Sequence, residues 1–204
     1  MKQQLLNLAE SKAMKGIAIL GIILHNYCHF LPVVQENEYT FDAKWPNMLL
    51  KSVANLDLHC VIDLLSFFGC YGVPVFLFVS GYGLVLKYEK DNSKNVSTLP
   101  FIGYHYMKLL RLMFLGYVAF AVVSYLHPHG YHGYDFGRVV AQLLMYINIL
   151  PNPDLIIKPG PYWFFGLMLE FYIVYRLLLY RRHWAYTVGM IIICWVLQEF
   201  CEPT

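Results

Sequence analysis

Five long apolar stretches, separated by more polar segments, run along the chain. They cover residues 14–34, 61–86, 107–126, 161–180 and 184–200. About 20 apolar residues in an α-helix are enough to cross the ~30 Å hydrocarbon core of a bilayer. The pattern therefore predicts an all-α fold, a multi-pass transmembrane bundle of about five spans.

The second apolar stretch holds an unusual number of residues that disturb a helix. Gly69, Gly72, Pro74, Gly81 and Gly83 all lie within residues 61–86. Proline removes a backbone hydrogen bond from a helix, and glycine allows neighbouring helices to approach closely. We expect this helix to be kinked or to pack tightly against its neighbours.

Residues 138–150 are also apolar, but the segment is too short to span a bilayer. Its length predicts an interfacial or re-entrant helix. If it does not span and the N-terminus is cytoplasmic, most lysines and arginines lie on the inner side of the membrane. The outer side then receives only Lys44, Lys51, Arg138 and Lys158. This distribution follows the positive-inside rule, whereas a spanning segment would weaken the bias.

Composition supports the same conclusion. Hydrophobic residues make up 58% of the chain and charged residues 14%, against about 45–50% and about 25% in soluble domains. So few charges cannot cover a soluble surface, so we expect a multi-pass protein of the cell membrane whose partners include the lipid bilayer. The net charge of +2 gives no indication of a nucleic-acid partner. The five cysteines lie mostly in apolar stretches and do not form a disulfide pattern.

His25 is the first candidate for chemistry. It follows Lys15 by ten residues, which places it about 15 Å further along a helix and near the middle of the bilayer. An ionisable side chain at that depth is costly and indicates function by default. The alternative is a neutral histidine that forms a hydrogen bond between two helices.

Lys108 and Arg111 are three residues apart on one helix face. We expect them at the inner boundary of the membrane, where such a pair can bind phosphate groups. Their alternative role is to anchor the helix by extending towards the membrane surface. Glu170 is the carboxylate that we expect to lie deepest in the membrane, where it could orient a histidine or pair with Arg176.

Metal binding has little support in the sequence. His25 and His29 share a helix face without a further ligand, and His127, His129 and His132 are more typical of an exposed loop. No zinc-type cysteine spacing, glycine-rich phosphate loop or nucleophile elbow is present. We therefore predict no metal site and no tightly bound cofactor.

Four segments, in this order, resemble the motifs of the membrane-bound acyltransferase family 3. The first is KGIAIL from Lys15, followed by His25. The others are GVPVFLFVSGY from Gly72, KLLRL from Lys108 and YWFFGLMLEFY from Tyr162. The resemblance extends over roughly residues 12–180. Lysine replaces the family's arginine at Lys15 and Lys108, which keeps the charge and loses the bidentate fork.

The resemblance implies transfer of an acyl group, commonly acetyl, from cytoplasmic acyl-CoA to a hydroxyl of a surface or secreted carbohydrate. On that reading His25 carries the chemistry, Glu170 orients it, and Lys108 and Arg111, with Lys15 as an accessory cation, hold the phosphates of the donor. Members of the family carry more spans, so the chain resembles the N-terminal half of such an enzyme. Polar faces left towards lipid would then favour self-association.

Two other classes of function remain open. Ionisable residues inside the membrane and a glycine-rich broken helix also suit a transporter, or an export subunit for a small solute or glycan. An inactive, truncated remnant of an acyltransferase is the other alternative. Binding or hydrolysis of acyl-CoA would separate an acyltransferase from a transporter.

Overall fold

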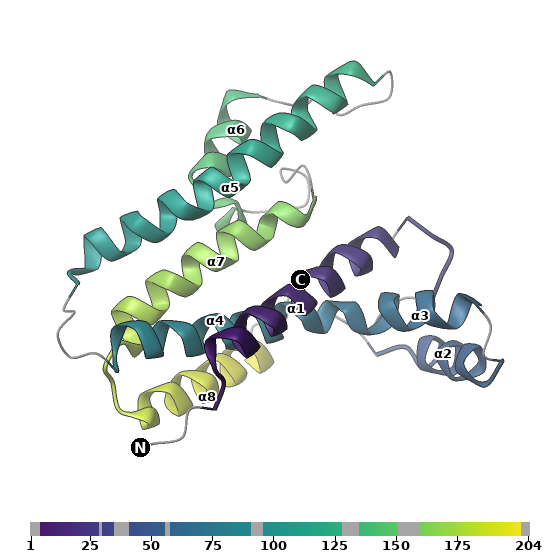
Figure 1. Ribbon diagram of the computed structural model, residues 1–204, viewed down its shortest axis with the longest axis horizontal. Coiled ribbons are helices and arrows are strands. Elements are labelled where there is room, and N and C mark those ends of the chain that lie inside the picture. Colours follow the sequence, from purple (N-terminus) through teal and green to yellow (C-terminus); the bar gives the residue numbers. More distant parts are fainter. Residues whose placement is uncertain are drawn as a thin grey trace. The chain divides into compact units, whose positions relative to one another are not determined.

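The protein is described by a computed structural model covering residues 5–28, 30–34, 41–55, 58–90, 96–127, 135–150 and 160–200. In these ranges all regular structure is helical, which confirms the predicted all-α class (Figure 1). The chain divides into two compact units, residues 1–87 and residues 88–204. Each unit is described by itself.

Unit 1 consists of α1 (Leu8–Cys28), α2 (Lys44–Asn55), α3 (Leu58–Phe68), the short 3-10 helix η1 (Gly69–Tyr71) and α4 (Gly72–Tyr88) without its last residue, Tyr88, which belongs to unit 2. α1 begins with a capping box, in which the Asn7 side chain accepts from the Glu10 backbone N–H and the Glu10 carboxylate accepts from the Asn7 N–H. This exchange satisfies two backbone donors at the start of the helix.

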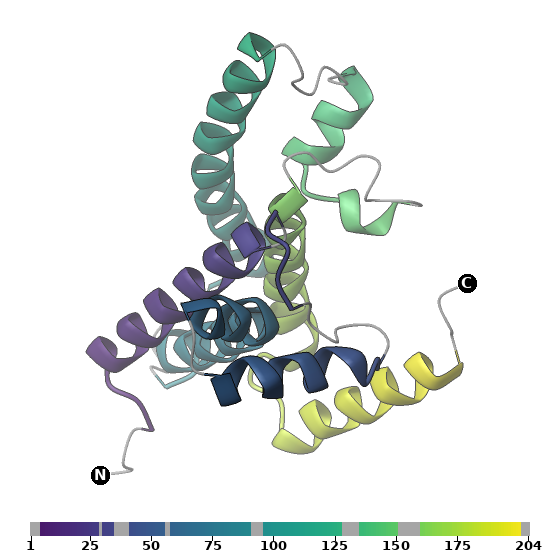
Figure 2. The same ribbon diagram turned by 90° about the vertical axis from the view of Figure 1, so that its right-hand side faces the viewer.

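α1 runs antiparallel to α3 and packs against α3 and η1 (Figure 1, Figure 2). At its start the Leu6 backbone meets the Tyr82 hydroxyl, and at its end the Cys28 thiol meets the Ile62 carbonyl. α3, η1 and α4 form one helical run of 30 residues, His59–Tyr88, that is long and apolar enough to cross a membrane. The 3-10 turn at Gly69–Tyr71 interrupts this run, as the glycines of the second apolar stretch predicted.

Unit 2 consists of α5 (Thr98–Leu126), α6 (Phe136–Leu143), the 3-10 helices η2 (Ile147–Ile149) and η4 (Gly160–Tyr162), α7 (Trp163–Val174), the π-helix η5 (Tyr175–Leu179) and α8 (Trp184–Phe200). α5 and α7 pack against each other in opposite directions. The ring of Tyr117 contacts that of Tyr162 at the start of α7, whereas Phe101 contacts Tyr172 and Tyr175 at its end.

α6 and η2 form a short hairpin beside α5. The Gln142 amide donates to the Met113 sulfur (3.4 Å), and the Tyr106 hydroxyl donates to the Leu143 carbonyl (3.1 Å), so the hairpin contacts the central part of α5. The chain turns at Met145 with a φ of 58°. It then returns to the start of α7, where the Asn148 amide donates to the Trp163 carbonyl (3.0 Å). Whether this hairpin is interfacial or re-entrant stays a prediction.

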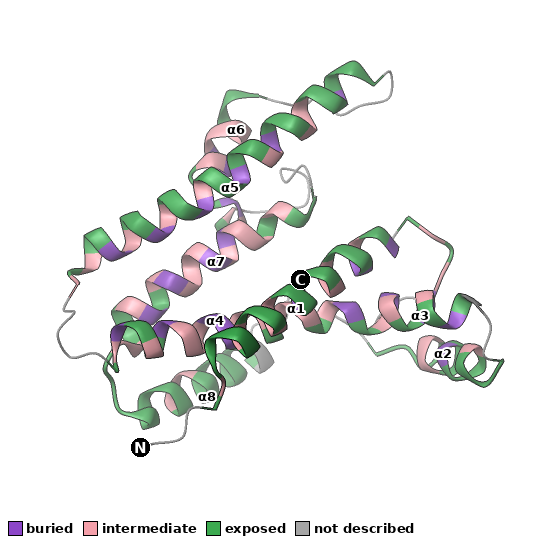
Figure 3. Ribbon diagram, viewed as in Figure 1, coloured by how far each residue is buried: buried purple, intermediate pink, exposed green. Residues whose placement is uncertain are grey.

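Among the described residues, three helical runs are long and apolar enough to cross a membrane: His59–Tyr88, Thr98–Leu126 and Gly160–Leu179. They correspond to the second, third and fourth predicted spans. Only 17–28% of the residues in their most apolar windows are buried, so most of their surface is available to lipid (Figure 3). The protein is therefore a membrane protein.

The first and last predicted spans, α1 and α8, are less apolar or shorter than these three. α1 carries Lys12, Lys15 and His25, which lower its hydropathy, and the apolar part of α8 is Trp184–Leu197. Their crossing stays a prediction. α1 packs against the α3 and η1 part of the His59–Tyr88 run.

Candidate functional site

His25 lies in the last turn of α1 and is 6% exposed. Its Nδ1 is 2.7 Å from the backbone carbonyl oxygen of Ser66 on α3. A carbonyl oxygen can only accept a hydrogen bond, so Nδ1 carries the proton and Nε2 of the neutral ring carries the lone pair. The bond joins two helices, as the structural alternative requires, and it also makes Nε2 the basic atom, as a catalytic role requires.

The position of His25 along the helices follows from its hydrogen-bond partner. Ser66 is seven residues into the His59–Tyr88 run. His25 therefore lies level with a point about 10 Å from the His59 end of that run. Lys15 lies on the same helix, about 15 Å away along its axis. Its ammonium group is 5.6 Å from the centre of the Phe76 ring on α4, within range of a cation–π interaction.

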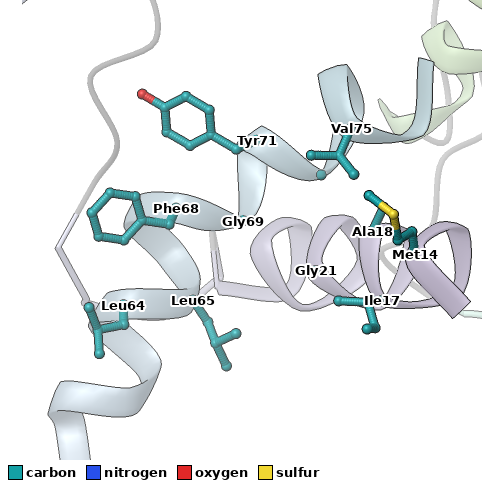
Figure 4. A pocket seen from close by; sticks show the side chains of 11 residues that line it. Met14, Ile17, Ala18, Gly21, Leu64, Leu65, Phe68, Gly69, Tyr71 and Val75 are labelled. Atoms are coloured by element: carbon teal, nitrogen blue, oxygen red, sulfur yellow. The ribbon is translucent and has the colours of Figure 1, made fainter. Parts of the chain in front are cut away.

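An open apolar groove of about 370 Å³ runs beside this histidine in unit 1 (Figure 4). α1 forms one wall, and α3, η1 and α4 form the other. No charged side chain lines it, and its residues are Met14, Ile17, Ala18, Gly21, Leu64, Leu65, Phe68, Gly69, Tyr71, Gly72 and Val75. Gly21 and Gly69, at one part of this lining, also adjoin His25.

Asp63 is a buried residue of unit 1 to which the sequence analysis gave no role. It is 7% exposed and accepts hydrogen bonds from the Val34 backbone N–H (3.1 Å) and the Ser52 hydroxyl. The carboxylate thereby ties α2 and the segment after α1 to α3. A signal was present, because Asp63 lies three residues before Ser66 and therefore on the same face of α3.

Lys108 and Arg111 lie on α5, which begins at Thr98, nine residues before the predicted start of this span at residue 107. The two cations are therefore about 15 Å and 20 Å into the helix, rather than in its first turns. Both are exposed on the surface of unit 2, and the part of the chain that the structure describes offers neither of them a hydrogen bond or an ion pair. The position of the two cations at the inner membrane boundary stays a prediction, because a helix can begin outside the hydrocarbon region.

Glu170 is half-buried on α7. Its Oε1 has no hydrogen-bond partner among the described residues, although this atom is shielded from solvent. Arg176, its proposed alternative partner, is engaged elsewhere: it donates to the Val96 carbonyl and stacks 3.9 Å from the centre of the Tyr180 ring. The Glu170–Arg176 pair is therefore not formed.

A buried histidine in unit 2 was missed by sequence reasoning. His105 on α5 is 5% exposed, and its ring packs against Phe101 (centroids 4.5 Å apart) and Tyr172 (4.1 Å). Its Nε2 is 3.4 Å from the Tyr88 hydroxyl. The signal in the sequence was its position one helical turn before Lys108, in a stretch rich in aromatic residues.

The five predicted site residues divide between the two units. His25 and Lys15 belong to unit 1, and Lys108, Arg111 and Glu170 belong to unit 2. Within the described ranges, no group of three or more His, Cys, Asp or Glu side chains is placed to hold a metal ion. The predicted histidines His29, His129 and His132 lie outside those ranges.

The comparisons with known proteins give one match. A family model described as an acyltransferase domain, that of acyltransferase family 3, matches residues 8–201, nearly the whole chain. No curated protein and no solved structure matches the chain significantly.

Proposed function

Since the chain belongs to acyltransferase family 3, we propose that it transfers an acyl group, acetyl in the simplest case, from acyl-CoA to a hydroxyl of a surface or secreted carbohydrate. The observation that carries this proposal is the buried His25, whose Nδ1–H is held by a carbonyl oxygen so that Nε2 is the basic atom. A neutral imidazole held this way is suited to general base catalysis.

In the proposed reaction, Nε2 of His25 takes the proton of the acceptor hydroxyl as its oxygen attacks the thioester carbonyl. The carbon–sulfur bond then breaks, the new ester bond remains, and the leaving thiolate takes the proton back from the imidazolium. The Ser66 carbonyl points its negative end at the Nδ1–H and so stabilises the imidazolium between these two steps.

Lys108 and Arg111 hold the phosphates of the donor in this proposal, with the N-terminus on the cytoplasmic side. Both side chains are exposed on unit 2 and have no partner within its described residues. An anionic ligand would offset the repulsion between two cations held close together at the inner membrane boundary. Arg111 can bind a phosphate through two parallel hydrogen bonds, whereas Lys108 acts as a point charge. Lys15 is an accessory cation, and Glu170 is an orienting carboxylate.

A transporter is the second candidate. It is favoured by the interruption of the His59–Tyr88 run at η1, because broken helices inside the membrane are common at transport sites. Acyl-CoA separates the two functions: an acyltransferase binds it and consumes it, and a transporter leaves it unchanged.

The test replaces His25 with glutamine in the full chain and measures transfer of radiolabelled acetyl from acetyl-CoA to carbohydrate in isolated membranes. We expect His25→Gln to abolish transfer at a normal protein level. The matched control is His183→Gln, at an exposed histidine next to α8, which should retain transfer. Normal transfer by His25→Gln would overturn the catalytic assignment. If the unmodified protein moves a small solute across the membrane without consuming acetyl-CoA, the transporter is favoured instead.

A further inference from the structure

The interruption between α3 and α4 supplies the carbonyl that holds His25. α3 ends at Phe68 and continues directly as the 3-10 helix η1, so the carbonyls of its last turn lose the regular α-helical partner four residues later. Ser66 belongs to that turn and is 1% exposed, so water cannot satisfy its carbonyl oxygen. The His25 Nδ1–H does so at 2.7 Å. In an unbroken helix the same carbonyl would accept from the backbone four residues later.

The absence of a side chain at Gly69 allows this bond to form. A Cβ atom at Gly69 would overlap the Cβ of His25 and would lie 2.8 Å from the Gly21 carbonyl oxygen. The second of these atoms is backbone and cannot rotate away. α1 would have to move off η1 to make room, and the ring of His25 would move with it, away from Ser66.

Gly72 crowds the same pair of helices without touching the histidine. A Cβ there would lie 2.6 Å from the Ala18 carbonyl oxygen and 2.8 Å from Cγ1 of Ile22. Gly21 is on the same interface but has room, because a Cβ there would lie 3.9 Å from the Gly69 carbonyl oxygen. The chain thus offers one crowded and one uncrowded glycine for comparison with Gly69.

We propose that Gly69 is a positioning residue for acyl transfer: the helix interruption that it begins, and the side chain that it lacks, hold His25 as the Nδ1–H tautomer and make Nε2 the base. The inference rests on the proposed function for its kinetic consequence only. The tautomer is a property of unit 1 that exists with or without acyl transfer.

The first measurement is the tautomer of the unmodified full chain. The protein is labelled with ¹⁵N-histidine in detergent micelles, and the His25 signals are identified as those that disappear in His25→Gln. We expect a neutral ring with a protonated Nδ1 and an unprotonated Nε2. An Nε2–H tautomer in the unmodified protein overturns the proposal, whatever the activity of the chain and whether or not any variant folds.

The second measurement compares Gly69→Ala with Gly72→Ala and Gly21→Ala. A displacement of about 1 Å at a catalytic group costs on the order of 10²-fold in rate, so we expect kcat of Gly69→Ala to fall by about that factor, with the KM for acetyl-CoA within about twofold of the original. In Gly69→Ala the Nδ1–H signal of His25 should be lost, or mixed with that of the Nε2–H tautomer. Gly72→Ala should lose thermal stability yet keep the His25 tautomer and the kcat of the folded protein. Gly21→Ala should keep the thermal stability, the tautomer and the kcat.

Three outcomes are distinguishable. If Gly69→Ala keeps the tautomer and the kcat, or if Gly72→Ala lowers kcat as strongly, the positioning role is wrong. If the unmodified protein shows the Nδ1–H tautomer but transfers no acetyl, the proposed function is wrong and the structural part of the inference stands. If the tautomer and kcat are lost together in Gly69→Ala alone, both hold.

Discussion

The two units build their helix interfaces in opposite ways. In unit 1, α1 meets η1 and the start of α4 through small residues, and backbone atoms of Ala18 and Gly21 lie where a side chain on the other helix would be. In unit 2, α5 meets α7 through rings, with Phe101, His105 and Tyr172 packed together. Helices in lipid gain no hydrophobic energy from meeting each other, so close packing must supply the attraction. Backbone proximity and ring packing are two ways to obtain it.

The largest effect should come from removing a ring in unit 2. Phe101 is 2% exposed and contacts the rings of Tyr88, His105, Tyr172 and Tyr175. We expect Phe101→Ala to lower the free energy of unfolding by about 3 kcal/mol, because it leaves a cavity that the neighbouring rings cannot fill. Thermal unfolding in detergent measures it. Leu99→Ala removes an exposed side chain of the same helix. If it lowers the free energy of unfolding equally, the packing of the rings does not stabilise unit 2.

Adding one methyl group should destabilise the interface of unit 1 more than the interface of unit 2. Gly72→Ala in unit 1 brings the new Cβ against a backbone oxygen, and we expect a loss of about 2 kcal/mol. Gly116→Ala in unit 2 brings it against the hydroxyl end of Tyr162, which can rotate away. We expect less than about 0.5 kcal/mol there, because alanine is also the better helix former. Equal losses in both variants would contradict the contrast between the units.

The next effect concerns donor binding and compares a cation from each unit. We expect Arg111→Gln to raise the KM for acetyl-CoA about tenfold, since hydrogen bonds to charged groups contribute about 1.5–3 kcal/mol. Lys15→Gln should raise it less, because this side chain already interacts with Phe76. Steady-state kinetics at two salt concentrations check both, and the difference should shrink at high salt. An unchanged KM in Arg111→Gln would leave helix anchoring as the role of that residue.

The smallest effect is a gain of stability in the hairpin of unit 2. Gln142 is 4% exposed, and its Oε1 has no hydrogen-bond partner among the described residues. Replacing it with methionine removes this oxygen and keeps the volume, so we expect an increase of up to about 1 kcal/mol in the free energy of unfolding. The loss of the weak contact with the Met113 sulfur works against this gain. A decrease on thermal unfolding would show that the amide stabilises the hairpin after all.

Much of the fold could be predicted because hydropathy reports which residues meet lipid. It located the helices of the second, third and fourth predicted spans and the interruption in the second. It also located residues 138–150, which are too few to span a bilayer. It could not locate the start of α5, because the helix extends into the mixed stretch from Thr98 to Tyr106. A helix continues for as long as its backbone bonds allow, whereas hydropathy changes at the membrane boundary.

The candidate site was predictable only in part. His25 was identified from its position among apolar residues; it is buried, and its catalytic role stays a prediction. The tautomer was not predictable, since it depends on a carbonyl 41 residues away that becomes available only where α3 ends. Asp63 and His105 were given no role for the same reason: their partners come from other helices, and spacing within one helix shows which face a residue shares but not which partner lies opposite.

The hairpin of α6 and η2 has a consequence for how the chain assembles during synthesis. The turn between them holds its own backbone, because the Met145 N–H donates to the Gln142 carbonyl and the Tyr146 N–H donates to the Ala141 carbonyl. Part of its packing comes instead from residues that follow it in the chain: Tyr162 packs on Ala141 and Ile147, and Gly166 leaves room for Asn148. These contacts form only once residues 160–166 have been synthesised. The hairpin therefore completes its packing after the segment that follows it has been translated.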